Sequence, residues 1–466
     1  MPTEFNSELL TNYENLVNLQ ESEVITAGSE TCDATTLAPS ETLCLPLPKG
    51  AGASVFRPVQ YLGSKLRVLE AITSLARDVV PQEGEAVDLF AGSTVVSQAF
   101  AASGFRTTSV DTQAYSRVFA QALLGIDREI AAGVDAEALL RDAENSIHRD
   151  YTWAAFAQEE RNSLEQSDAT ALRDLEARLP LAWRHGRIEA DSDAPLTSFY
   201  AGSYFGVRQA LQLDALGSVI ASPTTGLTPW QRAAAQTALM HAASRIVHSA
   251  GKHFAQPLKT RAGNAAFHDQ RLLSDRAIDV SAVFREACAT IASVAPKSDA
   301  GHHAVQDTAE RFVAKEGGTA KLFYLDPPYT AQQYSRFYHI LETIATNTLP
   351  RLPAGSAPTM GLYPDNRYKS AFSSRRHAAT ALALVLGHLA SLKATAIISY
   401  SASARGSDGN ARMISLEELM AVCRQEFGSR RVEMIEFAHR YRQFNSGENA
   451  NKGRDDKEVL VLCRSA

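Results

Sequence analysis

The chain has 466 residues, of which 45% are hydrophobic, and its formal net charge is −6. This length corresponds to two or three structural units, and this hydrophobic content excludes a wholly disordered or fibrous protein. The charge is unevenly placed, because residues 1–50 contain eight acidic side chains and one lysine, Lys49. This arm carries −7, so the remaining 416 residues carry +1. A polyanionic partner is therefore not excluded.

The five cysteines show no CxxC pair and no metal-ligand spacing, so the sequence indicates neither a disulfide framework nor a metal site. The amino-terminal residues lack the basic region and apolar core of a signal peptide. The most apolar stretch, Ala378–Leu392, contains His388 and is too short to span a bilayer. We expect a cytoplasmic protein that does not enter a membrane.

The predicted elements begin after residues 1–54, an acidic segment followed by prolines and glycines that we expect to be a disordered arm and linker. Strand-like runs then alternate with apolar helical stretches such as Val95–Ser103 and His377–Leu392. This alternation is typical of an α/β domain with a largely parallel sheet. The predicted strands are Ala86–Phe90, Thr107–Asp111, Leu322–Asp326, Ala394–Tyr400, Val432–Phe437 and Glu458–Cys463.

The segment 128–295 differs, because its apolar residues recur at helical spacing. One face of a helix is formed there by Leu239, Met240, Ala243, Ile246 and Val247, and Gly251 is the expected stop. The sequence therefore predicts a mostly helical block inserted into an α/β domain that consists of 55–127 and 296–466.

The first segment with chemical content is Val87–Thr94, where an apolar strand ends in Asp88 and small residues before a helix. At the carboxyl end of a first parallel strand, small residues let the backbone approach a cofactor closely. Asp111 follows the next strand, where doubly wound folds place an acid for ribose hydroxyls. The pattern indicates a nucleoside-containing cofactor, although no GxGxxG is present, and an ordinary strand–turn–helix connection is the alternative.

The second segment, Asp326-Pro327-Pro328-Tyr329, follows a predicted strand. A stiff turn is the simple interpretation, since consecutive prolines cannot continue a central strand. The functional interpretation explains every position: two prolines hold a carbonyl and a carboxylate toward one point, which suits an exocyclic amino group, and the tyrosine ring can stack on a base. The third segment, Gln60–Lys65, reads QYLGSK and by itself indicates no more than a helix start.

In this order the three segments resemble the DNA adenine-N6 methyltransferases, the group that includes the Dam methylases. The stretch Phe323–Thr343 is similar to a bacterial branch of that group. The resemblance implies a Rossmann-like methyltransferase sheet, an inserted target-recognition domain over 128–295, and S-adenosylmethionine as methyl donor. It implies site-specific methylation of adenine N6 in DNA, in a restriction-modification or defence setting with a possible partner protein, and a nucleoid-associated location.

The resemblance also assigns roles to residues at the matching positions. Lys65 would contact the methionine end of the cofactor, Asp111 its ribose, and Asp307 the surroundings of its adenine. Two departures from the family pattern are Thr94, in place of a second glycine whose absence could weaken cofactor binding, and Ser401, in place of an asparagine. The implied cofactor-binding residues are Tyr61, Gly63, Ser64, Lys65, Asp88, Phe90, Ala91, Gly92, Asp111 and Asp307, and the implied catalytic residues are Asp326, Pro327, Pro328 and Tyr329.

Basic segments near 252–261 and 367–377 are the candidates for phosphate contacts, although exposed cationic faces are common in proteins. His339 and Glu342, just after the second segment, are expected to support the pocket rather than to react. Two alternatives stay open: methylation of RNA adenine or of cytosine's amino group, and a non-catalytic DNA-binding protein that senses the cofactor. The candidate DNA-binding residues are Lys252, Lys259, Arg367, Lys369, Arg375 and Arg376.

Overall fold

The computed structural model describes residues 44–46, 54–80, 84–125, 128–147, 151–182, 194–258, 265–295, 301–316, 319–352, 361–401, 411–436 and 458–465. Apart from 44–46 and 54, the arm and linker expected over 1–54 lie outside these residues. Strands β1 (Cys44–Pro46) and β2 (Ser54–Phe56) form a small antiparallel pair.

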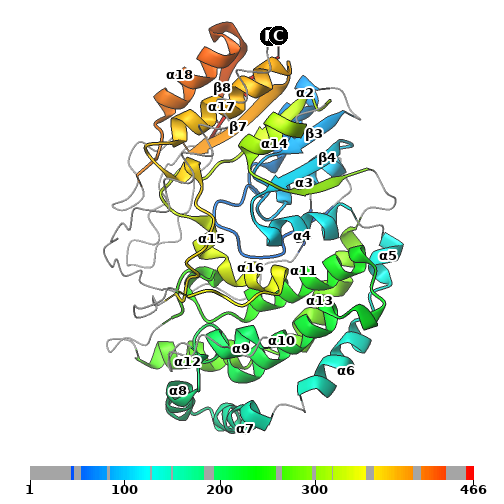
Figure 1. Ribbon diagram of the computed structural model, residues 1–466, viewed down its shortest axis with the longest axis vertical. Coiled ribbons are helices and arrows are strands. Elements are labelled where there is room, and N and C mark those ends of the chain that lie inside the picture. Colours follow the sequence, from blue (N-terminus) through cyan, green and yellow to red (C-terminus); the bar gives the residue numbers. More distant parts are fainter. Residues whose placement is uncertain are drawn as a thin grey trace.

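A seven-stranded sheet organises the rest of the chain, in the order β5-β4-β3-β6-β7-β9-β8 (Figure 1). The strands β5, β4, β3, β6 and β7 are parallel, and β9 runs antiparallel to both of its neighbours. The predicted α/β class is confirmed. The bounds are β3 Glu85–Asp88, β4 Arg106–Asp111, β5 His303–Gln306, β6 Leu322–Leu325, β7 Thr395–Ser401, β8 Val432–Glu436 and β9 Glu458–Cys463.

Both faces of the sheet are covered by helices, and the central strand β6 is accordingly buried and apolar at four consecutive positions. Leu322 and Tyr324 of β6 pack with α2 (Leu69–Val79) and α3 (Val95–Ala102). Phe323 and Leu325 point to the opposite face, toward the other apolar cluster. That cluster includes residues of α14 (Ala309–Glu316), α17 (Ala378–Ser391) and α18 (Leu416–Phe427).

A separate helical half lies below the sheet in Figure 1, with its own apolar core. Two elements that follow the second motif, α15 (Tyr334–Phe337) and α16 (His339–Thr346), lie between this half and the sheet, and α4 (Ala114–Leu123) packs against α11 and α16. The remaining helices are α5 Arg128–Ala132, α6 Ala136–Ile147, α7 Tyr151–Glu165, α8 Ala169–Arg178, α9 Pro195–Tyr200, α10 Val207–Ala221, α11 Pro229–Ile246, α12 Ala265–Arg276 and α13 Val280–Val294. Short 3-10 turns are η3 Pro223–Thr225, η4 Ala250–Lys252, η6 Ala371–Ser373 and η7 Ser429–Arg431.

Helix α11 is the centre of this half and is buried on nearly all sides. It begins with a capping box of Thr228 and Gln231, which satisfies free backbone N–H groups at its start. The helix ends at Ile246, one turn before the expected stop, and Gly251 instead takes a positive φ inside η4. Across the described residues, none of the helices combines the length and apolarity needed to cross a membrane.

Candidate active site

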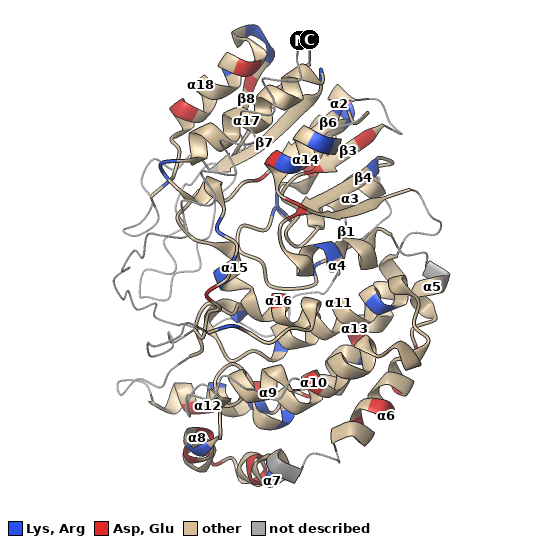
Figure 2. Ribbon diagram, in the orientation of Figure 1, with Lys and Arg blue, Asp and Glu red and all other residues tan. Residues whose placement is uncertain are grey.

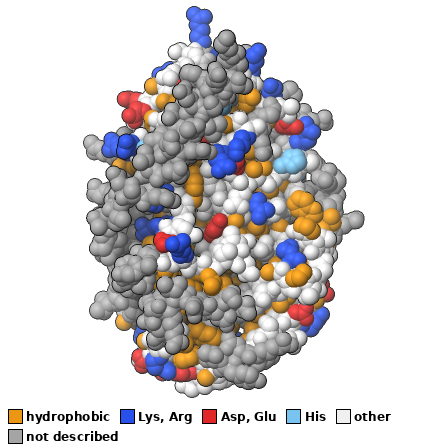
Figure 3. Space-filling model, viewed as in Figure 1, with side chains coloured by type: hydrophobic (Ala, Val, Ile, Leu, Met, Phe, Trp, Pro, Cys, Tyr) orange, Lys and Arg blue, Asp and Glu red, His pale blue; other side chains and the backbone are white. Residues whose placement is uncertain are grey.

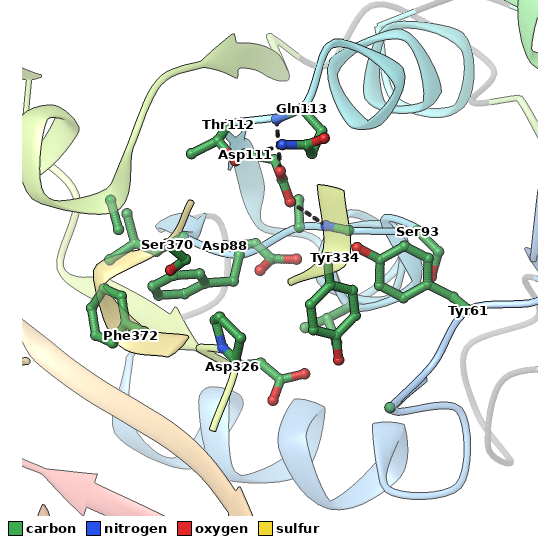
Figure 4. Close-up of a pocket in the computed structure, with 18 of the residues that line it drawn as sticks. Tyr61, Asp88, Ser93, Asp111, Thr112, Gln113, Asp326, Tyr334, Ser370 and Phe372 are labelled. Atoms are coloured by element: carbon green, nitrogen blue, oxygen red, sulfur yellow. Dashed lines mark hydrogen bonds between the residues drawn. The ribbon is translucent and has the colours of Figure 1, made fainter. Parts of the chain in front are cut away.

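A pocket of about 890 Å³, including its open mouth, lies at the carboxyl ends of β3, β4 and β6. Ligands bind at this edge in open α/β sheets, at the point where the strand order reverses. Figure 4 shows the carboxylates of Asp88 and Asp326 and the ring of Tyr334 around the same space. Of the expected catalytic residues, Pro327 and Tyr329 do not line the pocket. The expected site residues that line it are Tyr61, Gly63, Ser64, Lys65, Asp88, Phe90, Ala91, Gly92, Asp111, Asp326 and Pro328.

Asp88 closes β3 with a buried carboxylate. Its Oδ2 accepts a 2.7 Å hydrogen bond from the Ser97 hydroxyl, and its Oδ1 has no partner among the described residues. Burial raises the pKa of Asp88 to about 7, although the Ser97 hydrogen bond opposes that rise. A carboxylate that is held at such cost and faces a pocket is suited to a cationic ligand group.

The loop after β3 depends on two residues with positive φ. Gly92 has φ +50°, and a Cβ there would lie 2.7 Å from Cε1 of Tyr61, so no larger residue fits. Thr94 takes φ 64°, the left-handed conformation that favours glycine. Its hydroxyl donates to the Ser93 carbonyl at 2.7 Å, and Thr94 is not among the residues that line the pocket. The side chain of Thr94 therefore takes no space from a ligand.

Asp111 joins the loops that follow β3 and β4. Its Oδ2 accepts from the Gly92 N–H and its Oδ1 from the Gln113 N–H, both at 2.9 Å. Burial raises the pKa of Asp111, and these backbone donors oppose the rise. Asp307, the remaining expected cofactor residue, lies behind this corner: its N–H donates to the Asp111 carbonyl at 3.1 Å, and it does not line the pocket.

The second and third motifs meet through Lys65, which is buried. The Lys65 Nζ lies 3.0 Å from Asp326 Oδ1 and donates to the Tyr329 hydroxyl at 2.8 Å. That hydroxyl in turn donates to Asp326 Oδ1 at 3.1 Å. Burial opposes the charged form of Lys65, but nearby anionic groups, Asp326 first among them, raise its pKa well above the usual range. The ammonium therefore stays charged.

The acidity of Asp326 reflects the same contacts. Burial raises its pKa, the Lys65 ammonium lowers it, and a second carboxylate, Glu458, raises it again. The rings of Tyr329 and Tyr400 make an edge-to-face contact with their centres 5.2 Å apart, and the Arg412 guanidinium lies 5.3 Å from the Tyr329 ring centre. The Asp326–Tyr329 loop is thus positioned from three directions by side chains that lie far apart in the sequence.

Stacked tyrosines hold the 60–65 loop over the pocket. Tyr61 stacks on Tyr338 with ring centres 4.6 Å apart and on Tyr334 at 5.4 Å. The Leu62 N–H donates to the Tyr338 hydroxyl at 2.8 Å, and the Tyr334 hydroxyl donates to the Leu62 carbonyl at 3.2 Å. Helices α15 and α16 therefore fix the loop that carries Lys65.

His339 and Glu342 do not line the pocket. Glu342 accepts hydrogen bonds from the first N–H groups of α4, those of Ala114 and Tyr115, at 3.0 and 3.3 Å. His339 is packed among the rings of three tyrosines, and burial lowers its pKa to about 3, so its imidazole is neutral. These contacts support the interpretation of both residues as structural.

Several residues of the site lie outside the three motifs. Glu458 could have been noticed as an acid at the start of an otherwise apolar strand, whereas Arg412 has no local signal. Further pocket residues come from the segments that follow the second motif and precede α17; they are Gln333, Tyr334, Ser335, Tyr368, Ser370 and Phe372.

The expected DNA-binding residues differ in their surroundings. The Lys252 ammonium is engaged by Asp275 and the Val247 carbonyl, at 2.8 and 2.9 Å, and Lys259 lies outside the described residues. The Arg367 guanidinium lies over the Tyr363 ring at 5.3 Å. The exposed members are Lys369, Arg375 and Arg376.

The exposed residues Lys369, Arg375 and Arg376 lie beside the pocket in sequence, since Tyr368 and Ser370 line it. In the helical half, basic and acidic residues are interspersed on α8 and α10 (Figure 2). The face shown in Figure 3 has scattered basic side chains rather than one continuous patch.

The geometry agrees with one family of known proteins. The family model of D12 class N6 adenine-specific DNA methyltransferases matches residues 61–178 and 290–354. These segments contain the loops after β3 and β4, the stacked tyrosines Tyr61, Tyr334 and Tyr338, and the Asp326–Tyr329 motif. No curated protein matches the chain. Over these two segments the chain is similar to the D12 class, and the sheet and the pocket agree with that match; together they support an N6 adenine-specific DNA methyltransferase.

Proposed function

We propose that the chain methylates adenine N6 in DNA with S-adenosylmethionine as the methyl donor, bound in the pocket at the ends of β3 and β4. This cofactor would supply an electrophilic methyl group. The pocket fits it because three buried polar atoms on its walls have no partner among the described residues: Asp88 Oδ1, Ser64 Oγ and the Tyr324 hydroxyl. Such atoms are costly unless a ligand completes their hydrogen bonds.

We propose that different pocket residues bind different parts of the cofactor. The Asp88 carboxylate suits the ammonium of the methionine part, and Asp111 retains lone pairs for ribose hydroxyls after accepting its two backbone N–H groups. The backbone of Phe90–Gly92 permits close approach. We propose that Asp307 acts indirectly, by holding the Asp111 corner through its backbone hydrogen bond.

The observation that carries the proposed reaction is the arrangement around Asp326. Lys65 and Tyr329 both contact its Oδ1, so Oδ2 can accept an N–H of an adenine amino group in the pocket. The Pro327 carbonyl would accept the second N–H. These two acceptors pull the amino nitrogen toward a tetrahedral geometry in which its lone pair is nucleophilic, and positioning supplies much of the remaining rate enhancement.

Adenine in a duplex cannot reach this depth, so the base must be flipped out, at a cost of a few kcal/mol. Stacking on the Tyr329 ring, worth about 1–3 kcal/mol, offsets part of that cost. We propose that Lys369, Arg375 and Arg376 contact phosphates beside the pocket and that the helices within 128–295 recognise the target sequence. A nucleoid location and a restriction-modification or defence partner are further proposals, which copurification from a native host would test.

The reaction is tested with purified protein, duplex DNA and radiolabelled S-adenosylmethionine, together with calorimetry of cofactor binding. We expect Asp326→Asn to abolish methyl transfer, because an amide cannot serve as the anionic acceptor, and to leave cofactor affinity within about threefold of the parent. Asp78, an exposed acid on α2 that does not line the pocket, offers the matched control Asp78→Asn, which should keep full activity. Substantial transfer by Asp326→Asn would contradict the assignment, whereas loss of cofactor binding would place Asp326 in the cofactor site instead.

A further inference from the structure

A second buried carboxylate stands beside the catalytic loop. Glu458 is the first residue of β9, and its register opposite Ser401 of β7 places it at the edge of the sheet that carries the pocket. Its Oε1 lies 3.1 Å from the Lys65 Nζ and accepts a 3.0 Å hydrogen bond from the Ser399 hydroxyl. The residue is 8% exposed. A buried acid at this position requires an explanation, since none of the three motifs includes it.

The Lys65 ammonium lies within hydrogen-bond distance of more acceptors than it has N–H groups. Its ammonium contacts the Gly63 carbonyl at 3.1 Å and the Tyr329 hydroxyl at 2.8 Å, besides the carboxylates of Asp326 and Glu458 at 3.0 and 3.1 Å. Three N–H groups serve these four acceptors. One cation therefore lies between two carboxylates, and Asp326 does not hold the whole of its charge.

We propose that Glu458 is a positioning residue for methyl transfer, which takes a share of the Lys65 ammonium and so leaves the Asp326 carboxylate able to accept a hydrogen bond and then a proton from the adenine amino group. This inference rests on the proposed function. The amino nitrogen forms its bond to the methyl carbon as the carbon–sulfur bond breaks with its electron pair on sulfur. One N–H proton passes to Asp326 Oδ2, and the charges balance.

Each charged or polar group around Asp326 either favours or opposes the ionisation of its carboxyl group. Asp88 of β3 and Glu458 of β9 oppose its ionisation, Lys65 favours it, and the Tyr329 hydroxyl donates to it. Tyr324 of β6, whose pKa burial raises well above its usual value, and Tyr334 of α15 line the same pocket, and the Arg412 guanidinium lies over the Tyr329 ring. The carboxylate oxygens of Asp326 and Glu458 lie at most about 6 Å apart, because both contact one Nζ. At that range a like charge shifts a carboxyl pKa by roughly one unit.

The test is the pH dependence of single-turnover methyl transfer in Glu458→Gln, with Ser399→Ala as a control that removes the Ser399 hydrogen bond and keeps the charge. Asp326 must be ionised to act, so activity falls as the pH falls through its pKa. Removing the Glu458 charge lowers that pKa. We expect the acid limb of Glu458→Gln to move to lower pH by roughly one unit, with a plateau rate roughly threefold to tenfold lower, because the acceptor is a weaker base. The limb of Ser399→Ala should stay in place.

A second readout does not depend on turnover. Carboxyl NMR of protein labelled with [4-¹³C]aspartate, with the Asp326 signal assigned from Asp326→Asn, should show the same downward shift of the Asp326 pKa in Glu458→Gln. An acid limb and an Asp326 titration that coincide with those of the parent would overturn the inference. Should Glu458→Gln fail to fold, Glu458→Asp withdraws the charge by one methylene and should move the limb in the same direction by less. A parent protein that transfers no methyl group to DNA would instead refute the proposed function.

Discussion

Asp88 offers a prediction in which stability and binding change in opposite directions. Its carboxylate is buried, and Oδ1 has no partner among the described residues. Burial raises the pKa of Asp88 from 3.8 to about 7 in the folded protein. Replacement by asparagine removes the charge and retains an oxygen that can accept from Ser97. We therefore expect Asp88→Asn to stabilise the ligand-free protein above pH 7 and to weaken cofactor binding.

The magnitude follows from proton linkage. Between pH 4 and 7 the unfolded state ionises Asp88 while the folded state keeps it protonated, so this group destabilises the fold increasingly as pH rises and reaches its full effect above pH 7. A shift of about three units corresponds to about 4 kcal/mol at most. Between pH 5.5 and 8 the Asp88→Asn protein should gain about 2 kcal/mol relative to the parent, because about 1.5 units of that titration fall in this window.

The assay is urea denaturation of the parent and Asp88→Asn at pH 5.5 and 8, with calorimetry of S-adenosylmethionine binding at pH 8. Asp78→Asn, which replaces an exposed acid on α2, is again the matched control and should change neither quantity. We expect the cofactor dissociation constant of Asp88→Asn to rise at least tenfold, since a charged hydrogen bond is lost. A stability difference that is independent of pH, or unchanged cofactor affinity, would refute the reasoning.

Two further sets of variants test the base and DNA contacts. Tyr329→Phe keeps the stacking ring and loses the hydrogen bonds to Lys65 and Asp326, whereas Tyr329→Ala loses the ring and the hydrogen bonds. We expect slower methyl transfer in each variant. DNA affinity should be weaker by about 1–3 kcal/mol only in the alanine variant. Titration of duplex DNA that carries fluorescent 2-aminopurine at the target base measures the DNA affinity, and equal affinities of the two variants would contradict the stacking role. Joint replacement of Lys369, Arg375 and Arg376 by glutamine should lower the slope of log affinity against log salt by up to about three, while the control Lys315→Gln on α14 leaves it unchanged. An unaltered slope would remove these residues from the DNA-binding surface.

The fold and much of the pocket could be predicted because their signals are local. Asp88 ends an apolar strand, Gly92 and Asp326 come soon after one, and parallel strands bring their carboxyl ends to one edge of the sheet. The glycine pattern is also local, since it reflects φ at single residues. Thr94 shows the limit of that rule, because it takes the left-handed conformation without being glycine.

The features that escaped prediction depend on long-range contacts or lack an apolar pattern. Strand His303–Gln306 lies at the sheet edge and is only partly buried, so it has no continuous apolar run. Lys252 belongs to a basic stretch, yet Asp275 on α12 engages its ammonium. Glu458 acquires its significance from Lys65, almost at the other end of the described chain.

The central claim is that this chain transfers a methyl group to adenine N6 in DNA through Asp326. Methylation-sensitive sequencing of DNA from cells that express the parent protein or Asp326→Asn tests it most directly. We expect N6-methyladenine at a defined sequence with the parent and none above background with the variant. Absence of the modification with the parent, its appearance on cytosine instead, or equal methylation with both proteins would contradict it.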